Sequence, residues 1–196
     1  MILPILAYGD PVLRKKCTDI DADYPNLAEL ISNMWETMYN ASGVGLAAPQ
    51  IGKSIRLFTV DTSPFAEDEE LSEEERKQLK DFKMVFINAH MQTEAGKKWA
   101  FNEGCLSIPD IREDVSRLDT ITLSYLDTDF NPHTRTFDGL LARVIQHEYD
   151  HIEGVLFTDK ISPLKRRLLK GKLASISKGK IAVDYKMRFP AVKRVR

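Results

Sequence analysis

Two histidines placed four residues apart, His147 and His151, are the strongest chemical signal in this 196-residue chain. They belong to the run HEYDH, in which Glu148 follows the first histidine. Residues four apart on a helix lie one turn above each other, so both imidazoles can reach one cation from the same face. An ordinary pair of hydrogen-bonded histidines on a helix is the alternative. We favour a bound metal ion, with Glu148 beside it.

The third ligand of such a site distinguishes the enzyme classes that share this pattern. Metzincin peptidases continue as His-x-x-Gly-x-x-His, but after His151 and Gly154 this chain has Phe157 where the next histidine belongs. Thermolysin-like peptidases use a downstream glutamate on another helix, and the chain has no glutamate after Glu153. Neither peptidase pattern is complete.

Cys105 is the remaining candidate for the third ligand. It lies in the run NEGCLSIP, whose glycine and proline are typical of a loop, and a thiolate suits a divalent transition metal. Cys17 has no histidine near it in the sequence, so we expect a structural role for it. Cys105, His147 and His151 would leave a fourth position open for water, which is typical of catalytic sites.

An open position next to a carboxylate predicts hydrolysis. A divalent ion lowers the pKa of a bound water towards neutrality, and Glu148 can take its proton as general base. The same side chain can then return the proton to a departing amine.

Composition predicts one soluble domain. A chain of 196 residues suits a single core, and 43% hydrophobic and 29% charged residues do not indicate disorder or a fibrous repeat. The apolar start at Met1 meets Pro4 and has no basic flank, so we expect neither a signal peptide nor a membrane span. We therefore expect a cytoplasmic protein with reduced thiols.

The net charge of −1 conceals an uneven distribution. Residues 164–196 contain 12 of the 28 basic residues and one of the 29 acidic residues, so this part is about +11 and the remainder about −12. A polyanionic partner for the basic part and a solvated helix face are equally plausible interpretations.

Periodicity places these residues on particular elements. We expect helices at 21–40 and 139–153, a basic helix at 164–177, and a short exposed helix opening with a capping box at Ser72. The first should end near Ser42 and Gly43 with the glycine in a left-handed conformation, and Gly154 should end the second. Strands, mostly antiparallel, are expected at 56–60, 84–88, 91–93, 120–126, 134–137 and 181–187.

Three motifs then give a resemblance to a known family: GVGLAAPQ at 43–50, EGCLS at 103–107 and QHEYDH at 146–151. The chain resembles the peptide deformylases from Gly9 to Ser162. The resemblance implies an enzyme that releases formate from the N-terminal formylmethionine of new polypeptides. We expect an α+β fold with antiparallel and mixed sheets around a central HExxH helix, a C-terminal helix and a short terminal strand. Residues 1–163 would form the catalytic domain, with 61–83 as a charged surface insertion and 164–196 in the same domain.

The resemblance also implies roles for residues outside the metal site. Gln50 and the backbone N–H of Leu106 would face the developing oxyanion. Gly43 to Gly45 would run beside the substrate as an exposed edge. The methionine pocket would be formed by Val44, Leu106, Arg143 and Val144. For Arg143 we expect a packed stem and a head in solvent; for Glu103 and Arg117 we favour packing over contact with a ligand.

The expected partners follow from the same family. Fe²⁺ would be the usual metal, with Zn²⁺, Ni²⁺ or Co²⁺ compatible with the same ligands. The substrates would be N-formylmethionyl peptides. No DNA or membrane partner is expected. Ribosomal RNA could contact basic residues of the last helix, namely Lys165, Arg166, Arg167, Lys170 and Lys172.

Two other functions compete with this one. A zincin endopeptidase would need the third ligand that the sequence lacks. A non-catalytic nucleic-acid-binding module would need a closed site of four ligands, for which His90 and His133 are the spare candidates.

Overall fold

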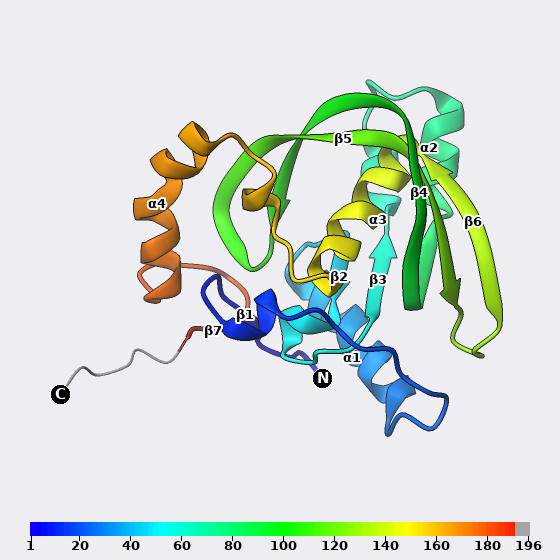
Figure 1. Cartoon of the computed structure of the whole chain (residues 1–196), viewed down its shortest axis with the longest axis horizontal. Coiled ribbons are helices and arrows are strands. Elements are labelled where there is room, and N and C mark those ends of the chain that lie inside the picture. Colours follow the sequence, from blue (N-terminus) through cyan, green and yellow to red (C-terminus); the bar gives the residue numbers. More distant parts are fainter. Residues whose placement is uncertain (191–196) are drawn as a thin grey trace.

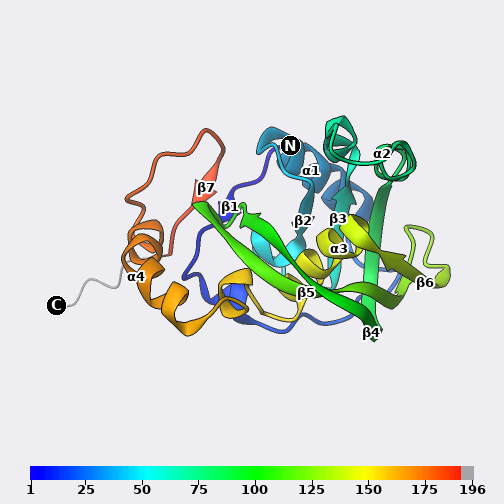
Figure 2. The ribbon, with the colours of Figure 1, turned by 90° about the horizontal axis from the view of Figure 1, so that it is seen from above.

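The computed structural model describes residues 1–190, and its architecture is the expected α+β fold. Five strands form an antiparallel sheet in the order β2-β3-β4-β5-β6, and β1 pairs in parallel with β7. The helix α3 lies in the middle of the molecule and packs against β2, β3, β5 and β6, while α4 lies at one end (Figures 1 and 2). The helices are α1 (Leu27–Asn40), α2 (Glu73–Lys80), α3 (Gly139–Ile152) and α4 (Pro163–Ser177). The strands are β1 (Ile5–Leu6), β2 (Gly45–Ala47), β3 (Leu57–Asp61), β4 (Lys83–Cys105), β5 (Ile108–Leu126), β6 (Pro132–Asp138) and β7 (Met187–Arg188).

The helix α1 is shorter than its sequence pattern predicts. It begins at Leu27 because Asn26, with φ of 55°, is in the left-handed region that a helix cannot include. At its other end the left-handed residue is Ser42, with φ of 52°, and not Gly43 as expected. Gly43 is needed for space instead, since a Cβ there would lie 2.8 Å from Leu106 Cδ1.

The central helix α3 agrees closely with its apolar periodicity. Leu141, Val144, Ile145 and Ile152 are buried in the core that the sheet forms. The helix ends at Ile152, and Gly154 has φ of 74°, as the sequence predicts. A Cβ at Gly154 would also lie 2.8 Å from the backbone of Arg14, so only glycine fits this turn.

The hairpin of β4 and β5 is much longer than the predicted short strands. β4 has 23 residues and β5 has 19, and the pair extends to a two-residue turn at Leu106 and Ser107, where Cys105 pairs with Ile108. Four shifts in pairing register along the hairpin mark bulges, which bend and twist strands. The extension places Cys105 next to α3.

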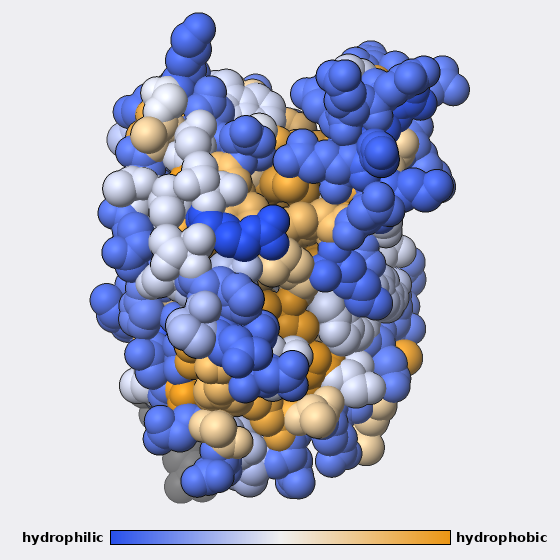
Figure 3. Space-filling view, turned by 90° about the vertical axis from the view of Figure 1, so that its right-hand side faces the viewer, coloured by the Kyte–Doolittle hydropathy of each residue, from blue (hydrophilic) through white to orange (hydrophobic). Residues whose placement is uncertain are grey.

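The segment 61–83, predicted from the sequence to be a charged surface insertion, is anchored to the core as well as exposed. Ser72 and Glu75 form the predicted capping box at the start of α2. Leu79 and Phe82 are buried, and the hydroxyl of Thr62 donates to the carbonyl oxygen of Leu79. Figure 3 views the molecule from the side of α2 and β6, and it shows hydrophilic side chains at the top with an apolar band below them.

The C-terminal part packs on the hairpin. Leu169, Leu173 and Ile176 of α4 are buried in one cluster with Ile108 and Val115 of β5. The terminal strand is shorter than predicted, Met187–Arg188 against 181–187, and the end of the basic tail lies outside the described residues. None of the helices from residue 1 to 190 is long and apolar enough to cross a membrane.

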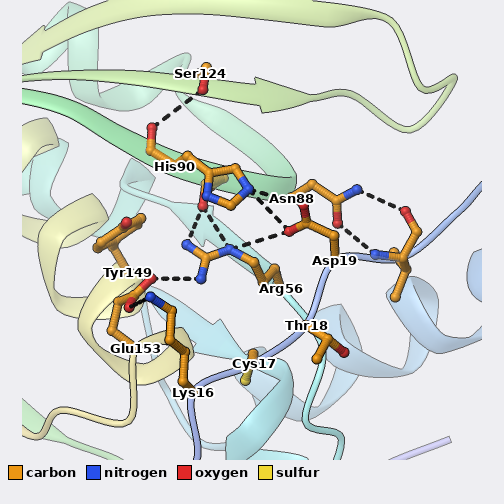
Figure 4. A network of polar contacts seen from close by, with 12 residues as sticks. Lys16, Cys17, Thr18, Asp19, Arg56, Asn88, His90, Ser124, Tyr149 and Glu153 are labelled. Carbon is orange, nitrogen blue, oxygen red and sulfur yellow. Dashed lines mark hydrogen bonds and ion pairs between the residues drawn. The ribbon is translucent and has the colours of Figure 1, made fainter.

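A buried arginine joins the N-terminal segment, the sheet and the end of α3 (Figure 4). Arg56 is 2% exposed, its Nη1 lies 2.6 Å from Glu153 Oε1, and its Nε donates to the carbonyl oxygen of Ala89 at 3.0 Å. Its guanidinium also lies 5.5 Å from the centre of the Tyr149 ring. These contacts fix the C-terminal turn of α3, which includes His151, relative to the sheet.

Candidate active site

Three of the predicted site residues meet between α3 and the tip of the hairpin. One ligand atom each from Cys105, His147 and His151 lies within 4.8 Å of the other two. Cys105 Sγ is 3.3 Å from His151 Nε2, and burial lowers the pKa of His151 well below its ordinary value, which keeps the ring neutral. One cysteine sulfur and two imidazoles are a donor set that fits a divalent transition metal, which binds the deprotonated forms of these groups.

The ring of His147 is held in the orientation that a ligand requires. Its Nδ1 lies 3.0 Å from Glu103 Oε2, and an ionised carboxylate only accepts, so Nδ1 carries the proton and Nε2 is left to face the cluster. On the other side the ring of Phe157 stacks with its centre 6.2 Å from that of His147. Phe157, which stands where metzincins have their third histidine, therefore packs against a candidate ligand.

Glu103 contacts a proposed ligand, so the expectation that favoured packing was wrong. Its carboxylate accepts from Arg117 Nε at 2.7 Å, from Arg117 Nη2 at 2.9 Å and from Arg143 Nη1 at 2.9 Å, in addition to His147. Burial raises the pKa of Glu103, but these hydrogen bonds outweigh burial and hold the pKa well below its usual range. Glu103 is therefore ionised, and its carboxylate is buried between Arg117, Arg143 and His147. Its neighbours in sequence gave no sign of this, because Arg117 and Arg143 are remote along the chain.

Arg143 also differs from its prediction. The side chain is 1% exposed, so its head does not reach solvent. The head instead donates to the backbone oxygens of Trp99 at 2.7 Å and Val115 at 3.0 Å, and it lies 4.4 Å from the centre of the Trp99 ring. The Glu103 carboxylate explains why an arginine can occupy an interior position here.

Glu148 lies beside the cluster without belonging to it. The side chain is 4% exposed, and its burial raises the pKa to about 7. Its Oε2 is buried and has no hydrogen-bond partner among the described residues, as expected of a group that awaits water or substrate. A Cβ on Gly45 would lie 2.3 Å from Glu148 Oε1, so glycine is required for β2 to pass this close.

Gln50 directs its amide at the same place. Its Oε1 accepts from the backbone N–H of Ala47 at 2.9 Å, which identifies Nε2 as the end facing the hairpin. Nε2 lies 3.7 Å from Cys105 Sγ and 3.3 Å from Ser107 Oγ. The side chain is buried, so this orientation is fixed by its surroundings.

A pocket of about 970 Å³ opens over the cluster and Glu148. All the expected substrate-binding residues line it: Gly43, Val44, Gly45, Leu106, Arg143 and Val144. Sequence reasoning missed several further parts of the wall, among them Pro64 with Phe65 and residues 182–185 near the C-terminus. Neither segment carries a chemical motif, and only the fold brings them to the pocket.

The remaining histidines and Cys17 lie elsewhere. His90 pairs with Asp19 at 3.1 Å and His133 with Asp127 at 2.7 Å, so neither supplies a fourth ligand to the cluster. This contradicts the closed site that a non-catalytic module would need. Cys17 is buried in the core, where burial raises the pKa of its thiol to about 11, as expected of a structural cysteine.

A helix with HExxH, a cysteine from an adjacent hairpin and an open pocket together define a metal-dependent hydrolase. The family model for polypeptide deformylase matches residues 2–167. A peptide deformylase of Christiangramia forsetii is 65% identical over 196 residues, covering 100% of both chains, and one of Flavobacterium johnsoniae is 63% identical with the same coverage. The crystal structure of a peptide deformylase from Legionella pneumophila has a TM-score of 0.76 at 37% identity, covering 92% of this chain and 98% of that one.

The chain therefore belongs to the peptide deformylase family, whose members are metal-dependent hydrolases that remove the N-formyl group from nascent peptides. The endopeptidase alternative is thereby excluded.

Proposed function

We propose that Cys105, His147 and His151 hold the metal ion of this deformylase and that Glu148 moves the protons of the reaction. The convergence of these three ligand atoms within 4.8 Å carries the proposal, together with the buried Glu148 oxygen that has no hydrogen-bond partner within residues 1–190. A divalent ion held there would polarise the formyl group and lower the pKa of a bound water. Glu148 would accept the proton of the attacking water and then donate it to the departing amine of methionine. Formate release from an N-formylmethionyl peptide, compared between the wild type and a Glu148 variant, tests these roles.

Gln50 and Leu106 would stabilise the negative charge that develops on the formyl oxygen. The Gln50 Nε2 group faces Cys105 Sγ at 3.7 Å, and Leu106 follows that cysteine in the turn, so both donors adjoin the metal ligands. Hydrogen-bond donors that are already in place before the reaction stabilise the transition state most effectively. Removal of one such donor costs roughly 10²–10³ in rate.

The substrate backbone would pair with residues 43–45. β2 is an edge strand of the sheet, and Gly45 at its start lines the pocket together with Gly43 and Val44. Pairing through the main chain leaves most side chains of the peptide unread, which suits an enzyme that acts on many nascent chains. The methionine side chain would lie among Val44, Leu106, Val144 and the stem of Arg143.

For the metal we propose Fe²⁺, with Zn²⁺, Ni²⁺ and Co²⁺ as alternatives that the same donors accept. The family resemblance supports iron, since ligand identity alone does not select one of these ions. Elemental analysis of protein purified without oxygen checks this choice.

We also propose that the enzyme works in the cytoplasm beside the ribosome and that α4 contacts ribosomal RNA. Nascent peptides are the substrates of the family, and α4 concentrates positive charge at one end of the molecule (Figure 1). Lys165 pairs with Glu113 and Arg166 with Asp159. Arg167, Lys170 and Lys172 are exposed and make no ion pair with a described residue, so they are the best placed for phosphates.

Replacing Arg167, Lys170 and Lys172 by glutamate is expected to weaken ribosome binding by roughly tenfold or more at low salt, because phosphate contacts dominate such affinity. Co-sedimentation with ribosomes measures the effect. Formate release from a short peptide should not change, since none of the three residues lines the active-site pocket. The control variant replaces Lys77, Lys80 and Lys97 by glutamate. These lysines are exposed outside α4, and their replacement changes the net charge by the same amount. Equal loss of binding in both triple variants would assign the effect to overall charge and exclude α4 as the contact.

A further inference from the structure

The turn at Leu106 and Ser107 is held from outside the hairpin by both ends of the chain. The hydroxyl of Tyr185 donates to the carbonyl oxygen of Leu106 at 2.7 Å. The backbone N–H of Tyr8 donates to the carbonyl oxygen of Ser107 at 2.8 Å. Consecutive carbonyls of one short turn are therefore fixed by two separate segments.

These two segments also hold each other. Met187 and Arg188 of β7 pair in parallel with Ile5 and Leu6 of β1. Figure 2 shows this pair close to the tip of the β4–β5 hairpin. We call residues 181–188 the C-terminal strap. Because the strap is joined to β1, which leads directly into Tyr8, the two hydrogen bonds to the turn act from one support.

This turn carries one of the two proposed oxyanion donors and contacts the other. The N–H of Leu106 belongs to it, and Ser107 Oγ lies 3.3 Å from Gln50 Nε2. Since the backbone has only φ and ψ as soft torsions, fixing the carbonyl of Leu106 restricts the torsions that also orient its N–H. Residues 182–185 of the strap line the pocket next to this turn.

We infer that Tyr185 is a positioning residue of the deformylase, which through its hydrogen bond to Leu106 aligns the oxyanion donors. This inference rests on the proposed roles of Leu106 and Gln50. Tyr185 touches no reacting atom; it acts on the backbone that does. Misalignment of a preorganised donor destabilises the transition state more than the bound substrate. Loss of the Tyr185 hydroxyl should therefore lower kcat and leave KM nearly unchanged.

Tyr185→Phe removes only the hydroxyl and tests the inference. Its kcat for formate release from an N-formylmethionyl tripeptide is expected to fall about tenfold, while KM stays within about a factor of two and each chain keeps one metal ion. Tyr24→Phe is the matched control: Tyr24 packs on the same core cluster as Tyr185, and its hydroxyl makes no hydrogen bond to a described residue. The control should keep the wild-type kcat.

Three results would overturn the inference: equal kcat in the two variants, a change in KM alone, or a loss of activity that follows a loss of metal. A parallel Gln50→Met variant separates this inference from the proposed function. If Gln50→Met kept the full kcat, the proposed role of Gln50 as an oxyanion donor would be wrong, and the inference about Tyr185 would lose its basis. If Gln50→Met lowered kcat while Tyr185→Phe kept it, only the positioning role of Tyr185 would be wrong.

Discussion

Replacing Glu148 by glutamine is expected to lower kcat for formate release by roughly 10²–10⁴-fold, the range typical of a lost general base. Glutamine keeps the shape of the side chain in its buried position beside Gly45 but has no basic oxygen to take a proton. The pKa of Glu148, raised to about 7 by burial, suits a group that first accepts and then returns a proton near neutral pH. A coupled assay for formate measures the change.

The metal content of the same preparation is the necessary control. Glu148 is not among the three proposed ligands, so the variant should bind one ion per chain like the wild type. Inactive protein without metal would place Glu148 in the coordination of the ion. Undiminished turnover would mean that another group handles the proton.

The second large effect is expected from Glu103→Gln. The change removes the carboxylate with which Arg143 pairs and one of the two with which Arg117 pairs, the other being Asp150, and it weakens the acceptor for His147. Breaking a buried ion pair from one side costs about 3–5 kcal/mol of unfolding free energy. Loss of the partner that orients a ligand histidine weakens metal binding by roughly 10–100-fold. Denaturant unfolding and metal titration measure the two effects separately.

Glu113→Gln makes the same substitution in the more exposed pair with Lys165, at 2.8 Å. Such pairs contribute about 0–1 kcal/mol, and this one lies outside the cluster, so stability and metal affinity should change little. If Glu103→Gln behaved like Glu113→Gln, the buried network would have no part in holding the metal site.

The residues with distinctive chemistry could be placed from the sequence, because their spacing reflects local geometry. His147, Glu148 and His151 lie within one turn and a half of helix, and the same periodicity that predicts the helix predicts their common face. Cys105 could be assigned as a candidate because the competing third ligands were absent from the rest of the chain. The sequence did not predict that Cys105 lies beside α3, because this placement depends on the long β4–β5 hairpin.

The parts that sequence reasoning missed depend on contacts between remote segments. Residues 92–102 of β4 are mostly polar and exposed, so they lack the apolar alternation by which strands are recognised. In the paired part of β5, the charged residue Arg117 occupies a buried position, which interrupts the apolar pattern. The burial of Arg143 depends on Glu103, 40 residues away. The contact between Tyr185 and Leu106 spans 79 residues and involves a backbone oxygen, which leaves no mark on the residue type of Leu106.

The most direct test of the account is X-ray absorption at the metal edge of the zinc-loaded protein. One sulfur at roughly 2.3 Å and two imidazole nitrogens at roughly 2.0–2.1 Å are expected, with one ion per chain. The sulfur should disappear from the spectrum of Cys105→Ser. A wild-type spectrum with nitrogen and oxygen ligands but without sulfur would contradict the assignment of Cys105, His147 and His151 as the metal site.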